Sequence, residues 1–228
     1  MPIATMFDTT SLETTVLVLS GGRARRLGQR KSAVNLGGRS ALRVLLDALP
    51  EDLPVVVVGD SAPDVERPVL VLREDPPFAG PLHAVSTAVH QQVATSSFIA
   101  LAVDLPLAAG HTLQLVPQLG SRVAGAPVGA VVPVDPSGRQ QPLAGAYDTQ
   151  AVREALARMG STVNQPMSAL LQQLHVLGLP INPDDAMLAD YLDIDTPTDL
   201  ELTRRRLQRT RPSTRTPSPD EPMHPDPG

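Results

Sequence analysis

Three short runs of the chain consist entirely of apolar residues: 16–19, 55–58 and 98–103. None of them alternates with polar residues, as a strand with one solvated face would. Runs of this length and character are typical of strands covered on both faces, as in a parallel sheet. At 40–49 and 82–93, between these runs, the sequence has helical character. The alternation predicts an α/β fold: a single doubly wound, mostly parallel sheet flanked by helices.

The remaining segments extend the same alternation. Turn-forming residues at 135–138 allow the chain at 142–147 to return beside a strand at 129–134. Thr196, Pro197 and Asp199 have the residue types of a helix N-cap and first turn. The further elements expected are strands at 69–72, 129–134 and 176–181, and helices at 112–119, 150–159, 166–174 and 197–209.

The chain has 228 residues, of which 42% are hydrophobic, and this suits one α/β domain. We expect the domain to span residues 15–209, after a flexible lead-in of residues 1–14. Residues 210–228 are rich in Pro, with Ser, Thr and Asp and almost nothing apolar. Such a segment buries too little surface to offset its ordering entropy, so we expect a disordered tail there.

The composition excludes several kinds of site. The chain has no cysteine, which rules out disulfides, thiolate zinc sites and cysteine nucleophiles. Aromatic residues make up 2% and the net charge is -5, which argues against a nucleic-acid partner. No apolar segment approaches membrane-spanning length, and no signal peptide is visible. We therefore expect a cytoplasmic protein, with no membrane association, that is a monomer or a weak homo-oligomer.

A glycine-rich, cationic loop follows the first apolar run. It starts with Ser20-Gly21-Gly22, directly after Leu19, and ends at Lys31. Glycines let the backbone turn sharply and let an anion approach its N–H groups. Further positive charge comes from Arg23, Arg25, Arg26 and Arg30. The loop is therefore predicted to bind phosphate, although its spacing is neither that of a Walker A loop nor that of a dinucleotide fingerprint.

Acidic residues are expected at the same edge of the sheet, because ligands of open α/β sheets bind at the carboxyl ends of the strands. Asp104 directly follows the run 98–103 and precedes Leu-Pro, which restricts the backbone just past the carboxylate. A carboxylate held there, facing a phosphate loop, suits Mg²⁺. Asp193 and Asp195 share one face of an extended segment, which makes Asp195 a candidate second metal ligand. The structural alternatives are that Asp104 caps a turn and that Asp195 belongs to the cap region of the last helix.

These motifs, in this order, resemble those of the molybdenum cofactor guanylyltransferase family and its nucleotidyltransferase relatives. The glycine loop matches the pattern L-x-G-G-x-x-x-R-x-G-x-x-K from Leu19 to Lys31. The other matching segments are Gly80-Pro81-Leu82 with Asp75 upstream, Asp104-Leu105-Pro106, and 193–199. The resemblance implies a Rossmann-like nucleotidyltransferase fold that binds GTP and Mg²⁺. The implied reaction transfers GMP to the phosphate of molybdopterin cofactor and releases pyrophosphate.

The resemblance also implies roles for individual residues. Leu19, Ser20 and Gly21 would line the nucleotide with their backbone, Lys31 would contact the triphosphate, Asp75 would bind the nucleotide, and Asp104 would hold Mg²⁺. The charges and amides of the loop extend this set. Arg26 joins Lys31 and Asp104 as a catalytic residue, Gly22 joins the nucleotide-binding residues, and Asp195 joins Asp104 as a metal ligand.

The sequence leaves four alternatives open. Gly59 and Asp60 stand where the family often has Asn, so GTP and CTP are both candidates for the nucleotide. The acceptor is either a pterin or the phosphate of a sugar or polyol. Residues 139–143 either meet the acceptor or form a plain strand edge. An alternative of another class is a non-catalytic nucleotide-binding module, against which the presence of Lys31, Asp104 and Asp195 argues.

Overall fold

A computed structural model describes residues 14–210, apart from 22, 25–28, 62–63 and 183–185. The expected lead-in and tail lie outside this part of the chain, except for Thr14 and Thr210. The described chain forms a central seven-stranded sheet with the order β11-β9-β10-β6-β1-β4-β5. Its strands are β1 (Thr14–Leu19), β4 (Val55–Val58), β5 (Leu70–Leu72), β6 (Ser97–Ala102), β9 (Ala130–Val134), β10 (Ala144–Asp148) and β11 (Val176–Pro180).

The sheet is mostly parallel, as predicted. β1 pairs in parallel with β4 and with β6. β5 pairs in parallel with β4, and β11 with β9. β10 runs antiparallel to both of its neighbours, β6 and β9. The expected return of the chain after residues 135–138 therefore takes place, and it brings the β9–β10 connection to the carboxyl end of β6.

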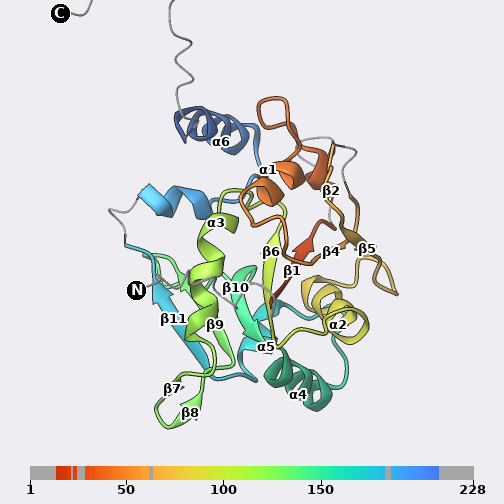
Figure 1. Ribbon diagram of the computed structural model, residues 1–228, viewed down its shortest axis with the longest axis vertical. Coiled ribbons are helices and arrows are strands. Elements are labelled where there is room, and N and C mark those ends of the chain that lie inside the picture. Colours follow the sequence, from red (N-terminus) through yellow and green to blue (C-terminus); the bar gives the residue numbers. More distant parts are fainter. Residues whose placement is uncertain (1–13, 22, 25–28, 62–63, 183–185, 211–228) are drawn as a thin grey trace, which may run out of the picture.

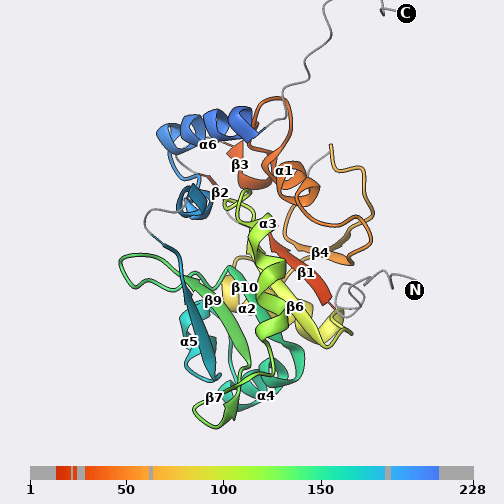
Figure 2. The ribbon, with the colours of Figure 1, turned by 60° about the vertical axis from the view of Figure 1, so that its left-hand side comes forward.

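Helices cover both faces of the sheet (Figures 1 and 2). They are α1 (Ala41–Asp47), α2 (Pro81–Gln91), α3 (Ala109–Thr112), α4 (Thr149–Met159), α5 (Met167–Leu171) and α6 (Pro197–Thr210). Leu17 and Phe98 belong to a core on one face, with side chains from α2, α4 and α5. Val16 and Ile99, one position away along the same strands, belong to a core on the other face with α1 and the segment after α3. The doubly wound architecture is thus confirmed.

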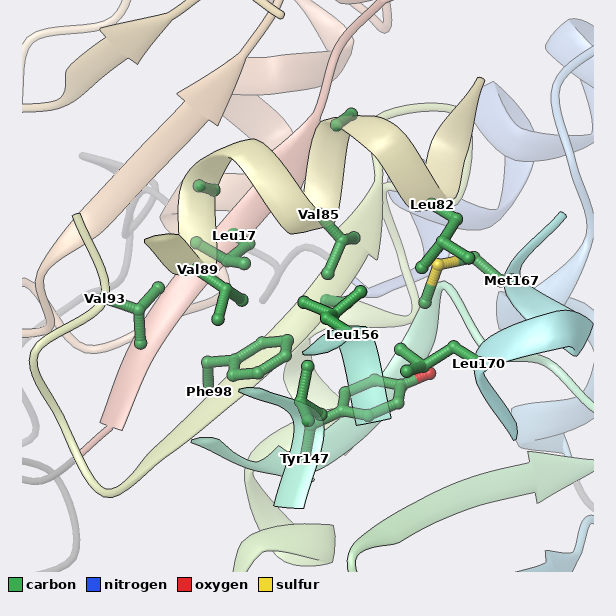
Figure 3. Close-up of a cluster of buried hydrophobic side chains, with 14 of the residues drawn as sticks. Leu17, Leu82, Val85, Val89, Val93, Phe98, Tyr147, Leu156, Met167 and Leu170 are labelled. Atoms are coloured by element: carbon green, nitrogen blue, oxygen red, sulfur yellow. The ribbon is translucent and has the colours of Figure 1, made fainter. Parts of the chain in front are cut away.

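An aromatic pair lies in the first of these cores. Figure 3 shows Val85 and Val89 of α2 above the rings of Phe98 and Tyr147. These two rings are cross-strand partners of β6 and β10, and they stack with centroids 5.1 Å apart. The Tyr147 hydroxyl donates a hydrogen bond of 2.6 Å to the carbonyl of Pro142. The buried pair therefore also anchors the β9–β10 connection, which reaches the functional site.

Two expected helices are shorter or tighter than predicted. The segment expected at 112–119 is α3 followed by the 3-10 helix η3 (Leu113–Gln118), because Pro117 has no N–H to continue an α-helix. The segment expected at 166–174 ends as α5 at Leu171. There, i→i+3 hydrogen bonds to the carbonyls of Leu170 and Leu171 tighten the chain. Short elements that were not expected are β2 (Arg23–Ala24), β3 (Gln29–Arg30), η2 (Lys31–Ala33), β7 (Arg122–Val123), β8 (Ala126–Pro127) and η4 (Ala186–Tyr191).

The last helix, α6, begins with the predicted cap. The carboxylate of Asp199 accepts hydrogen bonds from the N–H and the hydroxyl of Thr196, at 2.8 and 2.7 Å. Leu200 of α6 packs with Val44 of α1 in a third core cluster. Both ribbon views show α6 beside α1 (Figures 1 and 2). The C-terminal part of the described chain therefore lies against the elements that follow the glycine loop.

Candidate active site

A cavity of about 530 Å³ lies at the carboxyl ends of the central strands. Leu19 and Gly21 line it from the end of β1, Val58 from the end of β4, and Asp104 from the segment after β6. Its volume is in the range of small-molecule sites. The predicted convergence of strand ends is therefore present, and it encloses space for a ligand.

The start of the glycine loop rests on the chain that follows β4. The Ser20 N–H donates to the carbonyl of Val58 at 3.0 Å, and the Ser20 hydroxyl donates to the carbonyl of Asp60 at 2.6 Å. Gly59 has a φ of +121°, and a Cβ atom there would lie 2.5 Å from the nitrogen of Gly21. Any side chain would collide with the loop, so glycine is required. In this chain Gly59, at a position where the family often has Asn, therefore supports the glycine loop.

Lys31 connects the loop to two carboxylates. Its ammonium donates a short hydrogen bond to Asp104 and one of 2.9 Å to Asp195. Burial by itself would lower the pKa of Lys31, but the hydrogen bonds and charges of Asp104 and Asp195 outweigh it and raise the pKa above its usual value. Lys31 is also the only lysine of the chain, so all the other side chains that stay positively charged at neutral pH are arginines.

Asp195 reaches the site because the segment before α6 is tied to Asp104. The N–H of Ile194 donates to the carbonyl of Asp104 at 3.0 Å, and the Ile194 side chain is buried among residues of the third core cluster. Of the two acidic residues on either side of it, Asp195 pairs with Lys31 at 2.9 Å and Asp193 lines the cavity. Burial, together with the charges of Asp104 and Asp195, raises the pKa of Asp193.

The donor set fits a magnesium ion. Asp104 and Asp195 each place an oxygen atom on the same ammonium, so the two carboxylates converge on one cationic centre. Within the described ranges, no group of three or more His, Cys, Asp or Glu side chains is arranged to hold a metal. The pair Asp104 and Asp195 matches the usual requirement of Mg²⁺, which takes one or two carboxylates and completes its shell with substrate phosphates and water.

A rigid turn places the opposite wall of the cavity. The carboxylate of Asp135 accepts hydrogen bonds from the N–H groups of Ser137 and Arg139, at 2.9 and 3.0 Å, and from the side-chain amide of Gln141 at 3.3 Å. Arg139 and Gln141 both line the cavity, next to Pro142. Four residues of the segment 139–143 therefore line the cavity, namely Arg139, Gln141, Pro142 and Leu143.

The predicted site residues are distributed unevenly. Leu19, Gly21, Lys31 and Asp104 line the cavity, and Asp195 reaches it through Lys31. Ser20 is buried, with its hydroxyl bonded to the chain after β4, and does not line the cavity. Gly22 and Arg26 lie outside the described residues.

Asp75 is exposed and does not line the cavity, whereas its neighbour Glu74 does. The backbone carbonyl of Asp75 hydrogen-bonds to the ring of His83 at 2.9 Å. Glu74 and Phe78 both line the cavity, and neither was predicted from the sequence as a site residue. A lone aromatic residue between prolines and the Gly80-Pro81 motif was the available signal for Phe78.

A doubly wound sheet whose central strand ends present a glycine loop, a lysine and two carboxylates defines an α/β enzyme of the nucleotide-binding class. Comparisons with known proteins narrow this class. Residues 16–177 match the family described as MobA-like NTP transferase domain. A molybdenum cofactor guanylyltransferase from Rhizobium johnstonii is 27% identical over 201 residues, covering 86% of this chain and 93% of that protein. The chain belongs to the MobA-like NTP transferase family and is a nucleotidyltransferase.

Solved structures show the same fold. Molybdopterin-guanine dinucleotide biosynthesis protein A from Archaeoglobus fulgidus gives a TM-score of 0.63 at 21% identity, covering 86% of this chain and 99% of that one. The 2-C-methyl-D-erythritol 4-phosphate cytidylyltransferase from Thermus thermophilus gives 0.58 at 18% identity, with the same coverage. Among the described residues, none of the helices has the length and apolar character needed to cross a membrane.

Proposed function

We propose that this enzyme transfers GMP from GTP to the phosphate of molybdopterin cofactor, with Mg²⁺, and releases pyrophosphate. The observation that carries the proposal is the position of Lys31, between Asp104 and Asp195, at the cavity into which the glycine loop opens. The guanylyltransferase name of the Rhizobium relative, which matches over nearly its whole length, supports GTP and the pterin acceptor.

The sheet order gives the substrates a layout. The loop after β1 and the end of β4 form one side of the cavity, and the β9–β10 connection forms the other, with Asp104 after β6 between them. The nucleotide would lie on the β1 and β4 side and the acceptor on the side of Arg139 and Gln141. The reacting phosphates then meet at Lys31 and Asp104.

The chemistry follows from this charge distribution. An oxygen of the acceptor phosphate forms a bond to the α-phosphorus of GTP, and the bond to the bridging oxygen breaks, so that pyrophosphate leaves with the electron pair. Lys31 and the loop amides near Gly21 would neutralise charge on the transferred group and on pyrophosphate. Asp104 and Asp195 would hold Mg²⁺, which when bound offsets the negative charge of the phosphates. No covalent enzyme intermediate is needed, because positioning supplies much of the rate.

Charge removal at the centre of the site should reduce turnover without unfolding the protein. For Lys31→Ala and Asp104→Asn we expect turnover to fall by about 100- to 1,000-fold, which is typical when one group that stabilises the transition state is lost. Pyrophosphate release is the measurement, and Asp47→Asn, which removes a carboxylate from an ion pair with Arg39, is the control. Turnover at the wild-type level in either site variant would remove that residue from the mechanism.

The substrates are tested by a panel of nucleoside triphosphates with Mg²⁺ and molybdopterin cofactor, again with pyrophosphate as the readout. GTP should be preferred. Preference for CTP would instead identify a cytidylyl transfer, the second candidate, which Gly59 leaves open and for which the same fold occurs in the Thermus cytidylyltransferase. Because Lys31 is the only lysine, GTP with Mg²⁺ should also protect a single side-chain amine from reductive methylation.

A further inference from the structure

An exposed aromatic ring stands at the cavity. Phe78 lines it and keeps 68% of its surface exposed. The chain has only five Phe and Tyr residues and no Trp. Of those that the structure describes, Phe98, Tyr147 and Tyr191 are buried. Single apolar side chains are often exposed on protein surfaces, but this ring is exposed at a cavity, where aromatic side chains commonly contact a ligand.

The backbone of Phe78 is held in an unfavourable conformation. Its φ is +63°, in the left-handed region that a bulky side chain rarely adopts. The Phe78 N–H donates a hydrogen bond of 3.0 Å to the carboxylate of Glu74, which helps to hold this geometry. Strain of this kind persists only where the surroundings enforce it, and it is common at ligand-binding positions.

The segment that carries Phe78 is anchored on both sides. The His83 ring hydrogen-bonds to the carbonyl of Asp75 at 2.9 Å and to the hydroxyl of Thr162 at 2.8 Å. On the other side, the N–H of Asn164 donates to the carbonyl of Ala79 at 2.6 Å. The ring is therefore presented by a fixed turn. A ring presented in this way offers a flat, pre-positioned face, which lowers the entropic cost of binding a flat ligand.

The position of Phe78 indicates which ligand it meets. It belongs to the connection between β5 and α2, and β5 lies beyond β4, on the glycine-loop side of the sheet. Leu19, Val58 and Pro81 provide further apolar lining of the cavity. Arg139 and Gln141 belong to the β9–β10 connection, on the other side of β1 and β6. A nucleotide whose phosphates lie at Lys31 would extend its base toward Phe78.

We infer that Phe78 is the stacking platform for the nucleobase of the bound triphosphate. This inference rests on the proposed function, since it assumes that a nucleoside triphosphate occupies the cavity. Stacking against an aromatic ring requires a planar ligand. It discriminates poorly between the nucleobases, because every base has a π-face. Phe78 thus contributes affinity for the base, and the selection among bases comes from other groups of the site.

The test compares GTP with inorganic tripolyphosphate, which has the phosphates but no base. Phe78→Ala should weaken GTP binding by about 5- to 150-fold, the range for loss of one stacking contact, and leave tripolyphosphate binding unchanged. Isothermal titration calorimetry in the presence of Mg²⁺ measures the affinities for GTP and for tripolyphosphate. Leu202→Ala, which removes an exposed apolar side chain from α6, is the control and should change neither.

A second variant gives a direct signal. Phe78→Trp introduces the only tryptophan of the chain, so its fluorescence reports on this position alone. GTP should quench the emission and tripolyphosphate should not. Equal GTP affinity of Phe78→Ala and wild type, equal weakening of GTP and tripolyphosphate, or an effect on the pterin acceptor alone would each overturn the inference and leave the proposed function standing. Failure of the wild type to bind GTP at all would overturn both.

Discussion

Gly59 supports the glycine loop through its backbone. It combines a positive φ with contact distances that leave no space for a Cβ atom beside Ser20 and Gly21. A methyl group there would have to displace backbone, which cannot yield as the end of a flexible side chain can. The loop geometry at Gly21 therefore depends on a residue that does not itself line the cavity.

We expect Gly59→Ala to lower the free energy of unfolding by about 1–3 kcal/mol and to weaken binding of GTP with Mg²⁺. Denaturant unfolding and titration calorimetry measure the two effects. Gly125→Ala is the matched control, because Gly125 also has a positive φ, +85°, but no atoms within 4 Å of a Cβ. If the two variants bound GTP equally well, the contact between Gly59 and the loop would have no role in binding.

At the scale of elements, the α6 cap links helix stability to pH. Hydrogen bonds from Thr196 hold the pKa of Asp199 below its usual value. A carboxyl group with a lowered pKa in the folded state stabilises the protein above its unfolded pKa, and this contribution is lost as the pH falls through the folded pKa. The cap therefore acts fully at neutral pH and fades in acid.

Asp199→Ala should lower the free energy of unfolding by about 1 kcal/mol at pH 7, the usual loss for a helix cap. The difference from wild type should shrink as the pH falls below about 3.8, the ordinary pKa of the group. Thermal unfolding across a pH series measures it. The control is Glu201→Ala, which removes an exposed i,i+4 ion pair of the same helix. A difference that stayed constant down to the lowest pH would show that the carboxylate charge plays no part.

At the scale of the whole molecule, the site is completed by chain segments that are far apart in sequence. The Lys31–Asp195 contact joins residues 164 positions apart. Ile194 makes this possible, because its buried side chain and its hydrogen bond to Asp104 fix the segment that carries both acidic neighbours. Packing of α6 against α1 therefore serves the site as well as the core.

Ile194→Ala should lower the free energy of unfolding by about 2–5 kcal/mol, as a buried large-to-small change does, and should also weaken binding of GTP with Mg²⁺. Leu192→Ala is the control, since Leu192 is 54% exposed two positions away. Unfolding curves and calorimetry at a temperature where both variants are folded distinguish the effects. Unchanged GTP affinity in folded Ile194→Ala would confine this residue to stability.

Local sequence determined much of this protein. The apolar runs specified the buried strands, and the capping residues Thr196 and Asp199 specified where α6 begins, because these preferences act over a few neighbouring residues. The glycine loop, Lys31 and Asp104 could be placed at one edge of the sheet, since parallel strands end together. The 3-10 form of η3 has a local cause in Pro117, whereas no local signal marked the end of α5 at Leu171.

Only the tertiary structure decided which side chains share the cavity. Asp75 lies outside the cavity, whereas Glu74 and Phe78 line it. Gly59 supports the glycine loop by its close contact with Gly21. The tertiary structure also placed Asp195 against Lys31 through the packing of Ile194. These relations join segments whose separation in the chain carries no local signal. Distances across a cavity are set by how the cores on the two faces pack, and no short stretch of sequence contains that information.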